Sequence, residues 1–222
     1  AKTIKNDNSS RFGKFIKIKF NEKKDTIIGG YIETYLLETV RVLFQNTNER
    51  NYHIFYELLT GIGKDNIKNL NLDKWFDKSS SYLTNGVITR DDYNSNGDKI
   101  LDNHQFQHLK KMLSNIGINE DKQTKIWNII AFILIIGSYK YELNMNKLQD
   151  MSNLIECSST QLLEALYTHR IIVNGESIHN EQSEEEFYNS RDGLATKLYS
   201  RLFRYIVDVV NCNLNINYEC AS

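Results

Sequence analysis

The sequence predicts a mainly helical fold with one β-hairpin at its start, and two patterns of apolar residues lead to this expectation. From residue 15 to residue 20 apolar residues alternate with lysines, which is the period of a strand. Downstream of Leu37 apolar residues recur every three to four positions, which places them on one face of a helix. We find no internal repeat and no linker that would divide the chain into separate domains.

The predicted hairpin joins a strand at residues 15–20 to an apolar stretch at residues 26–32 through a polar turn of about five residues. The first strand has an apolar and a basic face: Ile16, Ile18 and Phe20 against Lys17 and Lys19. A lone hairpin is marginal in water because its edges and second face lack partners. We therefore expect it to belong to a larger sheet with strands outside this chain, and the start at Ala1 fits a piece of a longer protein.

Helical periodicity covers six further stretches: residues 51–59, 102–116, 120–136, 147–155, 160–168 and 183–210. Glycine follows three of them, at positions 61, 117 and 137, as expected for helix C-termini. The most apolar run, Ile126–Ile136, would span only about 16 Å as a helix, roughly half a bilayer core. We therefore expect a buried core helix and no membrane insertion.

The composition excludes several classes of protein. With 41% hydrophobic and 11% aromatic residues, the chain is not a disordered one. A net charge of −1 gives no reason to expect a nucleic-acid partner. The first 20 residues hold no apolar stretch of a signal peptide, and the three cysteines form no C-x-x-C motif. We therefore expect a reduced, cytoplasmic setting.

The segment Asn6–Lys14 gathers amides, two adjacent hydroxyls, an arginine and a glycine immediately before the first strand. Hydroxyl oxygens suit Mg²⁺, while amides and an arginine fork bind phosphate oxygens. These are parts that phosphoryl transfer requires. On composition alone, however, a polar surface loop that caps the following strand is the more frequent explanation.

This segment resembles switch I of the myosin motor domain, whose pattern is N-x-N-S-S-R-F-G-K. Further motifs of that family follow in the same order: Tyr35–Glu38 (YLLE), Glu49–Leu59 (ERNYHIFYELL), Arg191–Ala195 (RDGLA) and Leu198–Phe203 (LYSRLF). Kinesins share a shorter pattern, N-x-x-S-S-R, but Phe12-Gly13-Lys14 and the downstream motifs fit myosin instead. The resemblance extends over nearly the whole chain.

The resemblance implies that residues 1–222 are a partial myosin motor domain, a fragment of a P-loop NTPase-like α/β fold from switch I to just before switch II. Residues 1–14 would be switch I and residues 15–37 a hairpin of the central transducer sheet. Residues 38–222 would form the helical upper 50-kDa subdomain, with an actin-binding loop at about residues 169–182.

The resemblance also implies roles for individual residues, with ATP and Mg²⁺ as the cofactors. Asn6 would contact the nucleotide phosphates, and Asn8 would belong to the same binding loop. Ser10 would place its hydroxyl on Mg²⁺. Ser9 would lie at the γ-phosphate and help to relay a proton from the attacking water. Arg11 would form an ion pair with a glutamate of switch II, which is not in this chain.

The phosphate-binding motif G-x-x-x-x-G-K-[ST] is also not in this sequence. We therefore expect the chain alone to be inactive and the intact parent to be an actin-activated ATPase. An alternative is a myosin-like protein that binds actin or another partner but has lost its ATPase activity. A free-standing helical interaction module is disfavoured, since its hairpin would have to be stable without a sheet.

A second predicted site is a short hairpin that resembles the cardiomyopathy loop, an actin-contacting segment of myosins. Its residues are Arg170, Ile171, Ile172, Val173, Asn174, Gly175 and Glu176. Apolar residues closed by Asn-Gly are a strong hairpin signal in themselves, and an ordinary exposed hairpin is the alternative. Glu176 stands 16 residues before Asp192, where the family requires an acidic or phosphorylatable residue, so the actin contact would be permanently charged.

The resemblance implies filamentous actin as the partner and the actin cytoskeleton as the location. Light chains or calmodulin would bind through regions outside this chain. Two departures from the family pattern concern the subclass and not the fold. Ile135 and Ser138 replace a histidine and an asparagine of the usual L-H-L-G-N, and Gly193 stands where alanine is usual.

Overall fold

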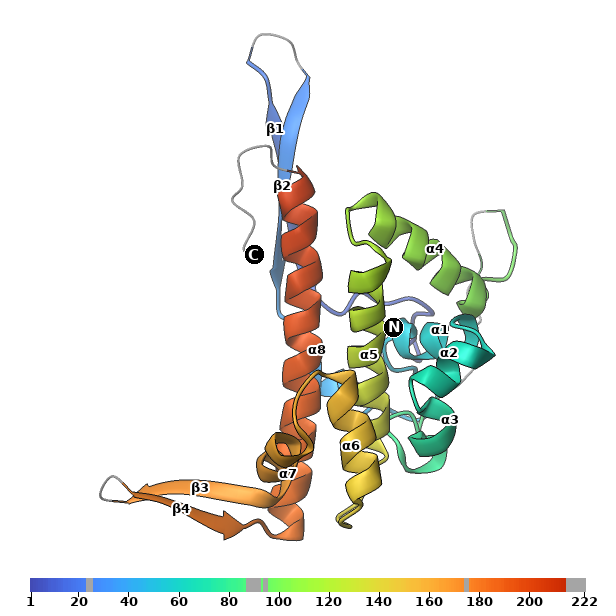
Figure 1. Cartoon of the computed structure of the whole chain (residues 1–222). Coiled ribbons are helices and arrows are strands. Elements are labelled where there is room, and N and C mark those ends of the chain that lie inside the picture. The colour runs from blue at the N-terminus through green and yellow to red at the C-terminus, as the bar shows by residue number, and fades with distance from the viewer. Residues whose placement is uncertain (23–25, 87–92, 94–95, 174–175, 215–222) are drawn as a thin grey trace.

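The computed structural model describes residues 1–22, 26–86, 93, 96–173 and 176–214. Its backbone is mainly helical, as predicted, and carries two β-hairpins. The long helix α8 (Glu184–Leu214) runs the length of the molecule, with one hairpin near each of its ends (Figure 1). At about 1.5 Å per residue, α8 is roughly 45 Å long.

The first hairpin pairs β1 (Gly13–Phe20) with β2 (Ile27–Tyr35) in antiparallel register, with Gly13 opposite Tyr35. The predicted hairpin is thereby confirmed, and both strands are longer than the alternation indicated. All of β1 is exposed, whereas β2 is partly buried where it packs on α8. The described residues form a sheet of two strands here, so the expected neighbouring strands stay a prediction.

Asn211 of α8 joins this helix to the edge of β2. Its Oδ1 accepts a hydrogen bond of 2.7 Å from the Ile32 amide, and its Nδ2 donates to the Ile32 carbonyl over 2.9 Å. Only 1% of Asn211 is exposed. The carboxamide therefore takes the place that a neighbouring strand would have at this point, while β1 lies open along its whole length.

Seven shorter α-helices precede α8: α1 (His53–Gly61), α2 (Lys64–Asn69), α3 (Leu72–Trp75), α4 (Asp102–Asn115), α5 (Glu120–Gly137), α6 (Met145–Leu154) and α7 (Ser159–Tyr167). The short 3₁₀ helix η1 (Thr39–Val42) precedes α1, and a second one, η2 (Lys78–Ser80), lies between α3 and α4. All six predicted helical stretches are present, with ends shifted by a few residues. The short helices α2 and α3 were not predicted.

Helix α5 is the centre of the core and packs against α1, α3, α4, α6 and α8. Nearly all of Ile126–Ile136 is buried, which confirms the predicted core helix. Gly61 shows how tightly its neighbours pack, because a Cβ there would overlap the ring of Phe106 on α4. In the part of the chain that the structure describes, no helix is both long and apolar enough to cross a bilayer.

The second hairpin pairs β3 (Thr168–Val173) with β4 (Glu176–Glu181). It follows α7, whose start is fixed by a capping box between Ser158 and Gln161. Val173 lies opposite Glu176, and the predicted turn residues Asn174 and Gly175 fall outside the described residues. The paired strands, residues 168–173 and 176–181, confirm the predicted hairpin, and they project away from the helices (Figure 1).

Candidate functional site

The segment before β1 is an irregular loop that its own hydrogen bonds hold closed. Ala1 and Ser9 exchange two backbone hydrogen bonds, each of 2.8 Å. Between them, the Thr3 amide donates to the Asn6 carbonyl over 2.8 Å, and the Thr3 hydroxyl donates to the same oxygen over 3.1 Å. All five predicted nucleotide-site residues lie in this loop, from Asn6 to Arg11, so the structure brings them together.

The two asparagines of the loop are fixed in different ways. Asn6 Oδ1 accepts a hydrogen bond of 2.9 Å from the Asn8 amide, which is an Asx turn. Asn8 Oδ1 in turn lies 3.1 Å from Nε2 of His53, the first residue of α1. Both asparagines are exposed. Because the Asx turn uses the oxygen of Asn6, a phosphate oxygen would be bound by its amide nitrogen.

The two serines donate their hydroxyl hydrogens to the backbone of the same loop. The Ser9 hydroxyl donates to the Ser10 carbonyl over 3.4 Å, and the Ser10 hydroxyl donates to the Phe12 carbonyl over 3.0 Å. The lone pairs of the exposed Ser10 oxygen stay available as acceptors. Mg²⁺ commonly takes one or two protein oxygens together with phosphate and water oxygens, so this hydroxyl fits the cation.

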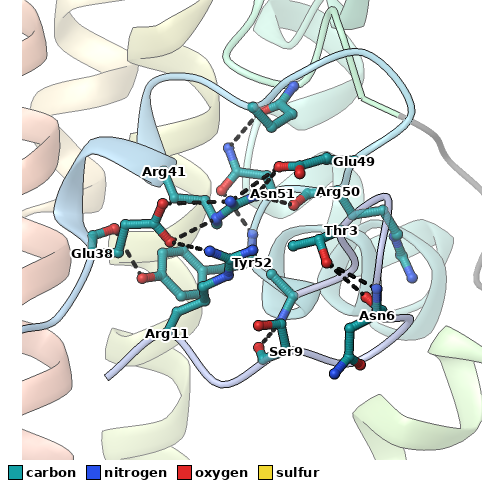
Figure 2. A network of polar contacts seen from close by, with 12 residues as sticks. Thr3, Asn6, Ser9, Arg11, Glu38, Arg41, Glu49, Arg50, Asn51 and Tyr52 are labelled. Atoms are coloured by element: carbon teal, nitrogen blue, oxygen red, sulfur yellow. Dashed lines mark hydrogen bonds and ion pairs between the residues drawn. The ribbon is translucent and has the colours of Figure 1, made fainter. Parts of the chain in front are cut away.

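Arg11 forms an ion pair with Glu38, on the far side of the first hairpin in the sequence (Figure 2). Its Nη1 lies 3.1 Å from Glu38 Oε2, and its carbonyl accepts the Glu38 amide over 3.0 Å. The Arg11 side chain is 18% exposed, and its Nε is buried without a hydrogen-bond partner among the described residues. The partner predicted from the resemblance lies outside this chain, and that pairing stays a prediction.

Arg41 holds Glu38 from the interior side and is itself paired with Glu49 (Figure 2). Arg41 Nε donates to Glu38 Oε2 over 2.9 Å, and its Nη2 donates to Glu49 Oε2 over 3.1 Å. Burial lowers the pKa of Arg41, but the hydrogen bonds and charges of Glu38 and Glu49 raise it further, so the net pKa shift is upward. The two arginines and two glutamates therefore form a charge-balanced cluster.

Arg50 ties the loop to the core. Its amide donates to the Lys2 carbonyl over 3.0 Å, and its fully buried guanidinium lies 2.6 Å from Asp102 at the start of α4. The same guanidinium lies over the ring of Tyr56, 4.1 Å from its centroid. Sequence reasoning singled out the segments containing Glu38, Glu49 and Arg50 but gave these residues no role. In the sequence these charged residues stand close to apolar residues, which is the signal that could have indicated buried ion pairs.

The comparisons with known proteins agree with this geometry. Residues 1–221 match the family model described as "Myosin head (motor domain)". The chain belongs to the myosin head family. This result confirms the resemblance inferred from the motifs, and it identifies the fold as part of a myosin motor domain.

Individual myosins match the chain over nearly all of its length. It is 35% identical to myosin-K heavy chain of Dictyostelium discoideum over 231 residues, which cover 99% of the chain and 26% of that protein. Myosin-1 of Saccharomyces cerevisiae is 37% identical over 225 residues, covering 97% of the chain and 11% of that protein. Unconventional myosin-Ic of Aquarana catesbeiana is 34% identical, covering 96% and 21%. The chain thus spans about a quarter or less of these myosins.

Two aromatic contacts attach this part of the myosin segment to α8, one from Phe12 of the loop and one from Tyr52 at the start of α1. Phe12 packs edge-on against Phe203, with ring centroids 4.9 Å apart, and Tyr52 stacks on Tyr199 at 4.7 Å. The Tyr52 hydroxyl donates to the Glu38 carbonyl over 3.0 Å. Burial raises the pKa of Tyr52 to about 12, so its hydroxyl stays protonated at neutral pH. The loop therefore packs directly against α8 at Phe203.

The predicted actin-contacting residues of this myosin segment lie apart from the loop. Residues 170–173 belong to β3 and Glu176 opens β4, whose other end, Glu181, shortly precedes the start of α8. The loop contacts α8 at Phe203, and the 19 residues between Glu184 and Phe203 correspond to roughly 28 Å of helix. The structure thus separates the two predicted sites and joins them through one rigid helix.

Proposed function

We propose that this chain supplies part of the nucleotide-binding and actin-binding machinery of a motor that couples Mg-ATP hydrolysis to binding of, and movement along, actin filaments. Membership of the myosin head family supports the proposal that the parent protein is a motor. The observation that carries the nucleotide part is the closed loop of residues 1–12, with the exposed hydroxyl of Ser10 and the anchored guanidinium of Arg11. In this proposal residues 1–14 are switch I.

Within the proposed site each loop residue has one task. Asn6 and Asn8 bind and orient the phosphates with their amide groups, and Ser10 holds Mg²⁺ through its hydroxyl oxygen. Ser9 orients the attacking water and passes on its proton. Arg11 closes the site through an ion pair. Bound Mg²⁺ supplies charge neutralisation on the phosphate oxygens.

These residues account for only part of a nucleotide site. The 222 residues include no G-x-x-x-x-G-K-[ST] motif, so other segments of the parent would have to cradle the phosphates. Catalysis depends on a complete, preorganised set of donors around the developing charge. We therefore infer that the chain by itself does not turn over ATP and that the parent protein does.

The first hairpin supports the placement of residues 15–37 in a larger transducer sheet. Its β2 edge is taken by Asn211 at Ile32, whereas β1 is exposed along its length. A sheet with one covered edge and one open edge grows on the open side, because unpaired backbone groups there need partners. In this proposal residues 38–222 form the upper 50-kDa subdomain around α5 and α8.

The second hairpin supports the actin-binding part of the proposal. It projects from the helices (Figure 1), its strand β3 ends in the sequence Ile171-Ile172-Val173, and β4 begins at the acidic Glu176. We infer that residues 169–182 contact filamentous actin and place the protein at the actin cytoskeleton. Light chains or calmodulin would bind the parent through other regions.

The experiment that tests the proposal is the Mg-ATPase activity of the full-length parent with and without filamentous actin. We expect turnover that rises with actin concentration, since the loop and the hairpin are joined through α8. Turnover near zero at every actin concentration would overturn the motor proposal. Retained co-sedimentation with actin in that case would identify an ATPase-dead actin-binding protein.

A further inference from the structure

An apolar cavity of about 170 Å³, partly open to solvent, lies where α1, α4, α5 and α8 meet. Ten side chains line it: Ile54, Leu109, Leu113, Ile126, Trp127, Ile130, Tyr199, Leu202, Phe203 and Ile206. Six of them are buried, among them Trp127 at 5% and Ile130 at 2% exposed. The cavity is therefore lined mainly by core side chains, together with four half-buried residues.

The chemistry of the lining favours an apolar occupant. Tyr199 is the one lining residue with a hydroxyl group, and burial raises the pKa of this tyrosine well above its ordinary value. Water needs two to four polar partners, so it gains little here. An apolar cavity of about 150 Å³ is large enough to take up benzene. The aromatic faces of Trp127 and Phe203 add favourable stacking geometry for a ring.

The cavity wall is also the support of the nucleotide loop. Phe203 faces the cavity and contacts Phe12, the residue that follows Arg11, at 4.9 Å between ring centroids. Tyr199 faces the cavity and stacks on Tyr52, whose hydroxyl donates to the Glu38 carbonyl. Occupancy of the cavity therefore restrains Phe203 and Tyr199. Through Phe12 and Tyr52 these two side chains support the backbone beside Arg11 and at Glu38.

We propose that this cavity is a regulatory site for a small aromatic hydrocarbon-like molecule, and that its occupancy pre-organises the loop for nucleotide binding. The second half of this proposal rests on the proposed function of the loop. A ligand that restrains Phe203 lowers the ordering cost that nucleotide binding must otherwise meet. Since coupling between sites is reciprocal, bound nucleotide strengthens binding in the cavity by the same factor.

Toluene is the probe, and Trp127 is the built-in reporter of binding. In the full-length parent we expect a saturable change in tryptophan fluorescence on titration with toluene. Trp75 does not line the cavity, so Trp75→Phe is the matched control and keeps the change. Trp127→Phe removes it. A fluorescence change that fails to saturate, or that persists in Trp127→Phe, would contradict toluene binding in this cavity.

Filling the cavity provides the second test. Leu109→Phe on α4 and Ile206→Phe on α8 each add ring atoms to the cavity from a half-buried position. Two variants are made so that the test can be carried out with one of them if the other does not fold. Toluene binding is expected to disappear in the folded variant. Toluene binding that is unchanged in both folded variants would contradict a site at this place.

The regulatory half is measured as the nucleotide Kd with and without saturating toluene. We expect a decrease of roughly five-fold, the lower end of typical coupling between sites. Toluene binding with an unchanged nucleotide Kd would contradict the regulatory role, while the cavity would still be a binding site. Toluene binding in a parent that binds no nucleotide would instead overturn the proposed function of the loop.

Discussion

The guanidinium of Arg11 and the carboxylate of Glu38 lie 3.1 Å apart, and the Glu38 amide donates to the Arg11 carbonyl over 3.0 Å. The same carboxylate accepts from Arg41, which is 5% exposed and also paired with Glu49. Arg11 therefore has an acidic partner inside this chain, at the end of the hairpin that its own loop begins. Any partner from another segment would compete with Glu38 or would have to bridge to it.

The first prediction follows from this competition. Glu38→Gln removes the charge that two arginines share, so we expect a loss of about 1–2 kcal/mol in the free energy of unfolding and a weaker nucleotide affinity in the parent. Chemical denaturation and nucleotide titration measure the two effects. Glu156→Gln is the control, because Glu156 pairs with Lys125 at an exposed site and should cost less than about 0.5 kcal/mol. Equal effects of the two changes would contradict a special role for Glu38.

The second prediction concerns the metal. In the parent, Ser10→Ala removes the hydroxyl that fits Mg²⁺, and we expect the Mg²⁺ concentration for half-maximal ATPase to rise. Ser10→Thr keeps a hydroxyl and should retain most of the wild-type dependence on Mg²⁺. Since Ser10 is exposed and donates only to the Phe12 carbonyl, thermal unfolding should change little in either variant. An unchanged Mg²⁺ dependence in Ser10→Ala would remove this residue from the metal.

The third prediction concerns actin. Glu176→Lys reverses the charge at the start of β4, and we expect a higher actin concentration for half-maximal ATPase, with an effect that shrinks at high salt. Glu164→Lys makes the same charge change at an exposed position of α7, outside the proposed actin-binding residues 169–182, and serves as the control. Equal effects of the two substitutions would point to net charge instead of a defined contact. Thermal unfolding of both variants checks the fold.

Strong periodic patterns allowed much of the fold to be predicted from the sequence. The eleven-residue run Ile126–Ile136 could only be a buried core helix, and the alternation from residue 15 could only be a strand. Helices α2 and α3 were missed because they have 6 and 4 residues, too few to show a period. Between them Asn71 takes a left-handed conformation at φ 55°, which no simple pattern indicates.

The candidate site was predicted less completely. The loop residues were found because their types and order form a motif. The Arg11–Glu38 pair was not found, because it joins positions on either side of a hairpin and depends on how β1 and β2 pair. Arg41 and Arg50 are buried arginines, which sequence alone treats as exposed. Their partners Glu49 and Asp102 become apparent only in three dimensions.

The fourth prediction uses the unusual glycine of α8. Gly193 is exposed inside the helix, and a Cβ there would meet no atom within 4 Å. Gly193→Ala should therefore raise the free energy of unfolding by about 1 kcal/mol and the Tm by about 2–4 °C. Gly137→Ala is the opposite control, because its Cβ would overlap the ring of Tyr82 and should destabilise the chain. A lower Tm for Gly193→Ala would show that the glycine has a conformational role.

The fifth prediction concerns Tyr52 at high pH. Burial raises the pKa of Tyr52 to about 12 in the folded chain, compared with about 10 for an unfolded tyrosine. Its contribution to stability is therefore complete below pH 10 and is lost as the pH rises toward 12, because only the unfolded chain releases the proton in that window. Tyr52→Phe cannot release this proton. We expect its stability to fall less steeply between pH 10 and pH 12, by a difference of about one proton. Denaturant unfolding at several pH values measures both slopes, and parallel slopes would mean that Tyr52 ionises at the same pH in the folded and unfolded chain.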